Sequence, residues 1–332
     1  MADNHEDRMV RSPSGAPATG RAVRDVFSAD ETFQRLTATA DDEFSRTARQ
    51  LIFSGLGAGL ALGMVFLGRT AGAAAAGDYE TLSANLLYPI GFVIVVVGRY
   101  QLYTENTLTP VTLVLTRVAS LPSLLRLWTI VFAANVVGAF IIGAFIAYPG
   151  VLDTPIRTMG ADIARHAFEI PVVDLFMRGI IAGALVGAMV WLTHAVREAT
   201  ARVWIIYGIF LLIPTAGLFH VITGFVEVVF GVFVGEGSWG QAFAFLAAVG
   251  LGNTVGGVVL VALLNFGQTR ERRVPEGSEL EQLSWREWLF GFRTGLALDE
   301  AVAPEVVDDG ELMPEVDHRL DPEGDEREPV DT

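Results

Sequence analysis

Cysteine and lysine are both absent from the 332-residue sequence, so all 23 basic residues are arginine. Without cysteine the chain can form no disulfide bond and no thiolate metal site. Charged residues are also scarce between positions 51 and 267, whereas the segments on either side hold most of the acidic residues and arginines. A middle segment with so little polar surface does not suit a soluble protein, so the composition predicts a membrane-embedded core with two polar tails.

The net charge is −15. Acidic tails without lysine favour a halophile, because carboxylates hold hydration and counter-ions in a very salty cytoplasm. Compositional drift in a GC-rich genome is the alternative explanation. The first residues contain no apolar run, so no signal peptide is expected there.

Crossing a bilayer takes about 20 apolar residues in a helix. Six stretches qualify, at 50–68, 84–102, 127–147, 175–194, 203–234 and 241–266. The fifth is too long for one span and contains Pro214, so we expect a break within it. If the N-terminus is inside, arginines concentrate in the tails and in the loops on the inner side of the membrane, whereas an outer loop holds Arg69. The positive-inside rule then predicts a multi-pass protein of the plasma membrane with both termini in the cytoplasm.

Three parts are predicted along the chain. Residues 1–48 form a cytoplasmic tail with an amphipathic helix, in which apolar residues recur at helical spacing from Phe33 to Ala48. Residues 49–267 form the transmembrane transport domain. Residues 268–332 contain a second amphipathic helix around Trp285 and Trp288, followed by an acidic tail that we expect to be disordered.

The two halves of the membrane segment share a pattern. Glycine stands at every fourth residue in both 55–63 and 179–187, an Asn-x-x-Gly motif begins at Asn135 and at Asn253, and the second and fifth spans contain Pro89 and Pro214. Each half holds an odd number of spans, so the halves must be inverted relative to each other. Inverted repeats with interrupted helices are typical of channels and transporters. The predicted fold is therefore an all-α membrane protein of six transmembrane helices in two inverted three-helix repeats, with broken second and fifth helices.

Polar residues inside the apolar stretches are the candidate pathway residues. His220 lies in the middle of the fifth stretch, where an imidazole is costly unless it is paired, and it can change protonation near neutral pH. Thr104, Glu105 and Asn106 follow the second stretch, and non-helical backbone at membrane depth must line a cavity or be buried in protein. An ordinary cytoplasmic loop is the alternative for this segment. We expect Asn135 and Asn253 to support the two helix breaks.

No metal-ligand spacing, phosphate-cradling glycine motif or nucleophile triad occurs in the sequence. An enzyme is therefore the least favoured class, and no cofactor and no nucleic-acid partner are expected. Three functions stay open at this point. They are a transport path for a small solute, a neutral-solute channel of aquaporin type, and a membrane scaffold or sensor that acts through the acidic tail. The lack of paired Asn-Pro-Ala motifs counts against the second.

In combination, these motifs resemble the formate/nitrite transporter family over about residues 45–267. The motifs are the glycine-rich first span, Leu102-Tyr103-Thr104, the Asn-x-x-Gly pairs, Trp191 at the end of the fourth span, and Gly217-Leu-Phe-His220. The resemblance implies an aquaporin-like protomer, a homopentamer in the lipid bilayer, and one pore per protomer for a small monovalent anion such as formate or nitrite.

The resemblance also implies roles for individual residues. The segment Leu102, Tyr103 and Thr104 would face the central His220, and the threonine hydroxyl would form a hydrogen bond with the imidazole. Hydrophobic constrictions would lie near Tyr88 and Phe92 on one side and near Ile213 on the other. The histidine would bind the solute or give it a proton.

The sequence Thr-Glu-Asn-Thr at 104–107 indicates a divergent branch of the family, and two further departures bear on the solute. Gly183 stands where members place an asparagine in the fourth span, and Ala167 stands where they carry a lysine ahead of it. That lysine is thought to draw anions toward the pore, so its replacement leaves the solute open.

Overall fold

The computed structural model describes residues 26–269 and 282–292, and apart from isolated bridges the regular structure in these ranges is entirely helical. The predicted all-α class is therefore confirmed. The acidic tail predicted after residue 300 and the first 25 residues lie outside the described residues.

Four helical rods in the described part of the chain are long and apolar enough to cross a membrane. The first combines α2 and α3, and the last combines α12, a π-helical segment η3, and α13. Helices α7 and α9 are the other two rods. The bounds of these elements are Ala48–Ala61 (α2), Gly63–Ala76 (α3), Leu121–Ala147 (α7), Val172–Ala195 (α9), Trp239–Val255 (α12), Gly256–Ala262 (η3) and Leu263–Gln268 (α13).

The other helices are shorter. Apolar helices that do not span alone are α4 (Leu82–Asn85) with α5 (Pro89–Val97), α10 (Ala199–Thr215), and α11 (Val221–Val234). The remaining ones are α1 (Ala29–Ser45), α6 (Thr109–Leu115), α8 (Thr154–Glu169) and α14 (Trp285–Phe290).

Two interruptions separate these shorter helices. Helix α5 ends at Val97 and α6 begins at Thr109, so the chain between them runs without regular structure. Helix α10 ends at Thr215 and α11 begins at Val221. Pro214 stands at the end of α10, and Gly217 adopts a φ of 65°, which glycine reaches at no steric cost. The chain can therefore change direction between the two helices.

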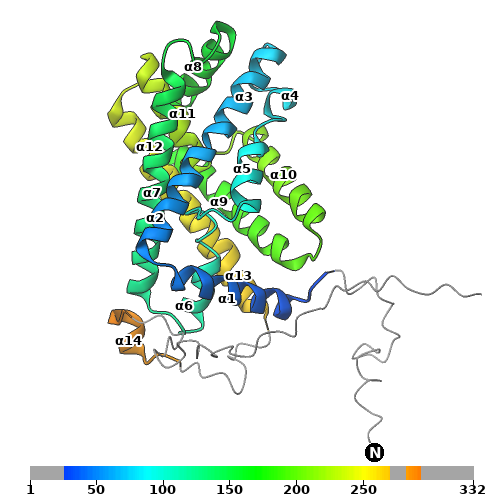
Figure 1. Ribbon diagram of the computed structural model, residues 1–332, viewed down its shortest axis with the longest axis vertical. Coiled ribbons are helices and arrows are strands. Elements are labelled where there is room, and N and C mark those ends of the chain that lie inside the picture. Colours follow the sequence, from blue (N-terminus) through cyan, green and yellow to red (C-terminus); the bar gives the residue numbers. More distant parts are fainter. Residues whose placement is uncertain (1–25, 270–281, 293–332) are drawn as a thin grey trace, which may run out of the picture. The chain divides into compact units, whose positions relative to one another are not determined.

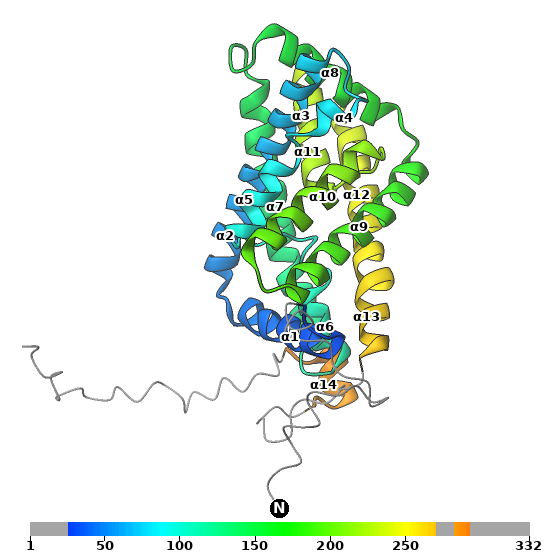
Figure 2. The ribbon, with the colours of Figure 1, turned by 90° about the vertical axis from the view of Figure 1, so that its right-hand side faces the viewer.

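The helices can be placed by the two ends of the bundle. Helices α3, α4 and α8 lie at one end, called here the α8 end, whereas α1, α6 and α14 lie at the other, called the α1 end (Figures 1 and 2). Helix α11 packs against α3, α7, α8 and α12 and runs from the middle of the bundle toward the α8 end (Figure 1).

Glycines let two pairs of long helices approach closely. A Cβ atom added at Gly59 of α2 would overlap the backbone oxygen of Asn135 in α7. In the same way, a Cβ atom at Gly183 of α9 would overlap the backbone of Asn253 in α12. Such small residues allow backbone contact between membrane helices, where packing rather than the hydrophobic effect drives association.

Helix α1 carries a capping box in which Ser28 and Glu31 satisfy each other's backbone N–H groups. The helix packs against α6 and α9 and buries one apolar face, made by Phe33, Leu36, Ala40 and Phe44. It therefore lies beneath the membrane rods at the α1 end.

One residue differs from the sequence prediction. Arg69 was placed in an outer loop, but the first rod continues to Ala76, so Arg69 lies inside α3 and its side chain is only 11% exposed. The prediction was wrong because alanines and glycines after position 70 extend the helix beyond the strongly apolar run.

Candidate functional site

His220 lies at the start of α11, in the interruption that follows α10, and is 1% exposed. Its Nε2 lies 2.7 Å from Oγ1 of Thr104, which belongs to the other interruption. The backbone N–H of Thr223 donates to Nδ1 of His220 over 3.4 Å, so Nδ1 must be the unprotonated nitrogen. The neutral ring then carries its proton on Nε2 and points it at the hydroxyl oxygen of Thr104.

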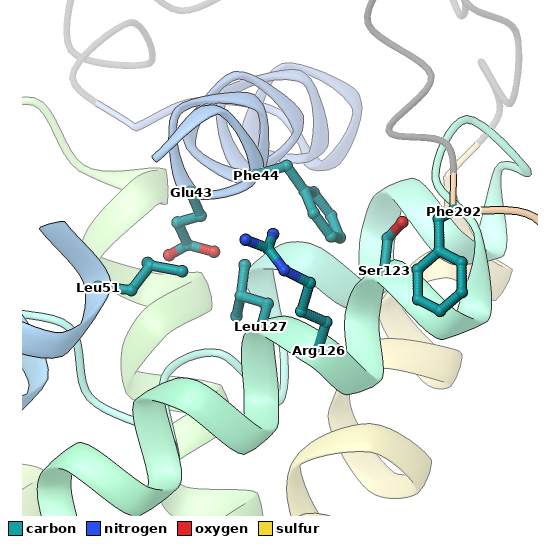
Figure 3. A pocket seen from close by; sticks show the side chains of 7 residues that line it. All are labelled: Glu43, Phe44, Leu51, Ser123, Arg126, Leu127 and Phe292. Atoms are coloured by element: carbon teal, nitrogen blue, oxygen red, sulfur yellow. The ribbon is translucent and has the colours of Figure 1, made fainter. Parts of the chain in front are cut away.

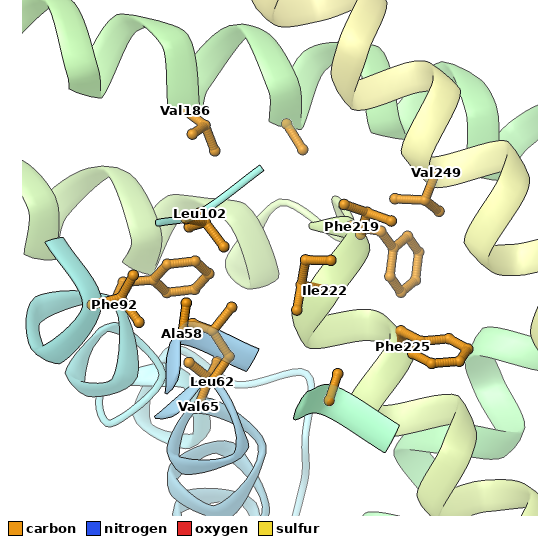
Figure 4. Close-up of a cluster of buried hydrophobic side chains, with 14 of the residues drawn as sticks. Ala58, Leu62, Val65, Phe92, Leu102, Val186, Phe219, Ile222, Phe225 and Val249 are labelled. Atoms are coloured by element: carbon orange, nitrogen blue, oxygen red, sulfur yellow. The ribbon is translucent and has the colours of Figure 1, made fainter. Parts of the chain in front are cut away.

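Aromatic rings enclose one side of this contact. Phe92 of α5 meets the His220 ring edge-on at a centroid distance of 4.9 Å, and Phe210 of α10 stacks on Phe92. Leu102 and Ile222 belong to the same buried apolar cluster as Phe92 (Figure 4). A shell of this kind excludes water, and an unpaired charge inside it would be strongly disfavoured.

Asn135 of α7 holds the interruption that carries Thr104. Its Oδ1 accepts from the backbone N–H of Tyr103 at 2.8 Å, and its Nδ2 donates to the carbonyl oxygens of Gly55 and Gln101 at 2.8 and 2.9 Å. One amide thereby satisfies two backbone groups of the interruption and also bonds to a carbonyl of α2.

Asn253 of α12 does the same for the interruption that carries His220. Its Oδ1 accepts from the backbone N–H of Val221 at 2.9 Å, and its Nδ2 donates to the carbonyl oxygens of Gly179 and Phe219 at 2.8 and 3.1 Å. The two asparagines therefore make the same set of contacts in the two halves of the chain.

A second group of polar side chains lies between His220 and the α8 end. The hydroxyl groups of Tyr88 and Thr223 lie 3.0 Å apart, and both residues are buried. One helical turn further along α11, Oε1 of Glu227 accepts from Nη1 of Arg69 at 3.0 Å. The spacing of Glu227 from His220 puts both residues on one face of a helix, which is a signal that the sequence does contain.

A third group lies on the α1 side of Thr104. Thr109 donates to Oε2 of the buried Glu43 at 2.7 Å, and Asn106 donates to Oε1 of Gln101 at 3.2 Å. Burial raises the pKa of Glu43 to about 7. Glu105 lies near enough to Glu43 for the two carboxyl groups to interact electrostatically.

Glu43 also borders a cavity of about 340 Å³ at the α1 end. Figure 3 shows its carboxyl group pointing toward the guanidinium of Arg126, with Phe44, Leu51 and Leu127 around them. The cavity lies beside α1, away from the His220 contact.

The predicted site residues thus divide into groups. Thr104 contacts His220 directly, and Phe92 and Leu102 lie beside them. Ile213 is fully buried in α10, and Tyr88 is on the α8 side.

Three predicted residues turn elsewhere. The Tyr103 hydroxyl lies 2.7 Å from that of Thr254, and its ring packs against Phe132. Glu105 and Asn106 lie toward Glu43. Phe210, which stacks on Phe92, was missed because one more phenylalanine in an apolar run gives no signal in the sequence.

Comparison with known proteins shows which family and which folds this chain is similar to. The family model described as formate/nitrite transporter matches residues 30–267. The chain is similar to the inner membrane protein YfdC of Escherichia coli (strain K12), at 29% identity over 249 residues, covering 71% of this chain and 77% of the relative. It is also similar to the formate channel FocA of Haemophilus influenzae, at 25% identity over 237 residues, covering 63% and 83%.

Two solved structures have similar folds. One, described as an FNT family ion channel, has a TM-score of 0.62 at 22% identity and covers 72% of this chain and 98% of that chain. The other, a pentameric formate channel with formate bound, has a TM-score of 0.55 at 22% identity and covers 65% and 95%.

Proposed function

Because this chain belongs to the formate/nitrite transporter family, we propose that it is a pore for a small monovalent anion of a weak acid. Proteins of this family are channels and transporters rather than enzymes, and the apolar helices make the chain an all-α, multi-pass protein of the plasma membrane. Its relatives include a formate channel and a probable formate transporter. Formate, nitrite or a similar weak acid is the proposed solute.

The contact between Thr104 and His220 supports this proposal most directly. It joins the two helix interruptions inside an apolar shell, where a bare anion would be costly. An arriving anion favours a protonated imidazole, so His220 takes up a proton from the bulk solution and passes it to the anion, which returns the ring to its neutral form. The solute then crosses the apolar stretch beside Phe92 as the neutral acid, and Thr104 holds the ring in place.

The proposed architecture has six spans in two inverted halves. The matching contacts of Asn135 and Asn253 support it, because each asparagine satisfies the backbone of one interrupted span. With the arginine-rich segments inside, the α1 end faces the cytoplasm and the α8 end faces outward.

Five copies form the proposed assembly, as in the pentameric formate channel with a similar fold. Large apolar side chains are exposed along the helices, among them Phe53 of α2, Phe145 of α7 and Trp204 of α10. Such surfaces suit contact with lipid and with neighbouring copies.

A flux assay of the purified protein in proteoliposomes tests the function. We expect uptake of formate, nitrite or acetate to exceed that of empty liposomes and to rise as the pH falls. Water and glycerol permeability, measured by stopped-flow swelling, should stay at the background level. Glycerol swelling without any weak-acid flux would overturn the proposal and favour a neutral-solute channel.

A further inference from the structure

The ion pair between Arg69 and Glu227 is a buried polar feature that the proposed mechanism does not use. Arg69 comes from α3 and Glu227 from α11, and their side chains are 11% and 3% exposed. A single contact of 3.0 Å joins Nη1 to Oε1. A buried ion pair contributes little to stability unless its remaining polar atoms are also satisfied.

Those remaining atoms are not satisfied. Oε2 of Glu227 and Nε of Arg69 are both buried, and neither has a hydrogen-bond partner among the described residues. The pair therefore presents one free acceptor and one free donor inside the protein. Leaving such atoms unpaired is costly, so their presence points to a ligand that supplies the complementary groups.

The pair also lies in line with the central histidine. His220, Thr223 and Glu227 follow one another at helical spacing on a single face of α11, and seven residues of helix place Glu227 about 10 Å from His220. Thr223 pairs with Tyr88 midway. The pair thus lies on the α8 side of Tyr88 and His220.

The charges around the pair are few. Helix α3 contributes Arg69 alone, α12 has no ionisable residue, and the one on α7 is Arg126 at its α1 end. From α8, His166 lies near enough to influence Glu227, and the guanidinium of Arg157 lies over the ring of Phe230 on α11 while it donates to the carbonyl oxygen of Ala147. The Tyr88 hydroxyl is the other titratable group nearby.

The α8 charges Asp162 and Arg165 pair at the surface, and Arg165 also pairs with Glu236. Within the ion pair itself, the guanidinium of Arg69 is balanced by the carboxylate of Glu227.

We propose that Arg69 and Glu227 form a binding site that takes the solute as its neutral acid. The acid O–H donates to Oε2 of Glu227, and the adjacent oxygen of the acid accepts from Arg69. No proton changes hands at this site. The proposal rests on the proposed function and narrows its substrate class to small carboxylic or oxygen acids that carry a hydroxyl and an acceptor oxygen on one atom.

Two consequences follow for selectivity. Anions of strong acids, such as nitrate and chloride, have no neutral form to bind, and the Glu227 carboxylate repels them. Solute from the α8 end reaches the constriction already neutral, so His220 supplies a proton only to anions that arrive from the α1 end. Ala167, in place of the family's lysine, agrees with a pathway that does not concentrate bare anions at this end.

Proteoliposome influx of formate across a range of outer pH, with nitrate as the competing anion, tests the site. In the wild type, the half-saturating concentration of total formate should rise about tenfold per pH unit, because only the acid form binds. In Glu227→Gln, the half-saturating concentration of the acid should rise about tenfold for one lost charge-assisted hydrogen bond, while maximal flux is retained. Nitrate flux relative to formate should increase, because the repelling charge is gone.

Glu236→Gln is the matched control, since it removes a partly exposed carboxylate at the same end, and it should change none of these quantities. If Glu227→Gln fails to assemble, the double variant Arg69→Gln/Glu227→Gln leaves no unpaired buried charge and is read in the same way. A half-saturating concentration of formate that does not depend on pH in the wild type would overturn the inference. Equal loss of flux for every solute in the variant would also overturn it, because that is the effect of a structural ion pair. Liposomes that carry no weak acid at all would instead overturn the proposed function.

Discussion

Oγ1 of Thr104 lies 2.7 Å from Nε2 of His220, although 116 positions separate the two residues in the chain. The contact exists because both residues stand in helix interruptions, where the backbone leaves its regular path and turns toward the middle of the bundle. Each interruption is held by one asparagine from a neighbouring rod. The position of His220 therefore depends on the two interruptions and on the two asparagines that hold them, and each can be perturbed separately.

Thr104→Val removes the hydroxyl and keeps the shape of the side chain. A buried hydrogen bond contributes about 1 kcal/mol, so we expect formate flux to fall roughly fivefold to tenfold and its pH dependence to change, because the imidazole loses its fixed orientation. Flux in proteoliposomes across pH is the measurement. Thr193→Val is the control, since Thr193 is buried but bonds only to the Val190 carbonyl. Equal effects of the two substitutions would contradict a specific role for Thr104.

Asn253→Asp keeps the oxygen that accepts from Val221 and removes the two hydrogen bonds that the amide donates. It also places a carboxylate against the carbonyl oxygens of Gly179 and Phe219. We expect a loss of roughly 2–4 kcal/mol in stability, seen as a lower unfolding temperature in detergent. Asn265→Asp, in the last turn of α13, should shift that temperature little because Asn265 is only partly buried. Similar shifts for both variants would show that Asn253 does not hold the interruption.

Much of this arrangement could be predicted from the sequence. The Asn-x-x-Gly motifs at Asn135 and Asn253, Pro214 beside the second break, and the isolated His220 mark positions where the local pattern departs from an apolar helix. Departures of this kind are visible in the amino-acid sequence itself. The all-α class followed from the apolar runs in the same way.

The contacts made across the bundle could not be predicted. Arg69 and Glu227 are 158 positions apart, and in the sequence Arg69 reads as a loop residue and Glu227 as a single acid within an apolar stretch. Glu43 likewise reads as part of the polar face of α1, yet it is buried beside Thr109. Which polar residue meets which depends on helix rotation and on where a helix ends, and neither follows from periodicity.

Gly183→Ala tests the close contact between α9 and α12. The added methyl group would overlap the Asn253 backbone, so the helices must separate, and we expect a loss of about 1–3 kcal/mol. Gly208→Ala is the matched control on α10, where the new methyl group meets nothing. It should leave stability equal or raise it by up to about 1 kcal/mol through helix propensity. Unfolding temperatures in detergent separate the two cases, and a stabilised Gly183→Ala would contradict the described contact.

Glu43 gives a prediction for pH. Burial raises its pKa from the ordinary value of 4.5 to about 7 in the folded protein, against the weaker lowering effect of the hydrogen bond from Thr109. The folded state then binds more protons than the unfolded state between these two values, so this residue lowers stability as the pH rises from about 4.5 to 7 and has a constant effect above. Glu43→Gln removes that contribution while the amide oxygen can still accept from Thr109. The difference in unfolding temperature between variant and wild type should therefore grow in favour of the variant across this range and then level off. Glu31→Gln, at the exposed start of the same helix, should produce no such rise. A difference for Glu43→Gln that stays flat across the range would mean that Glu43 reaches solvent in the folded protein.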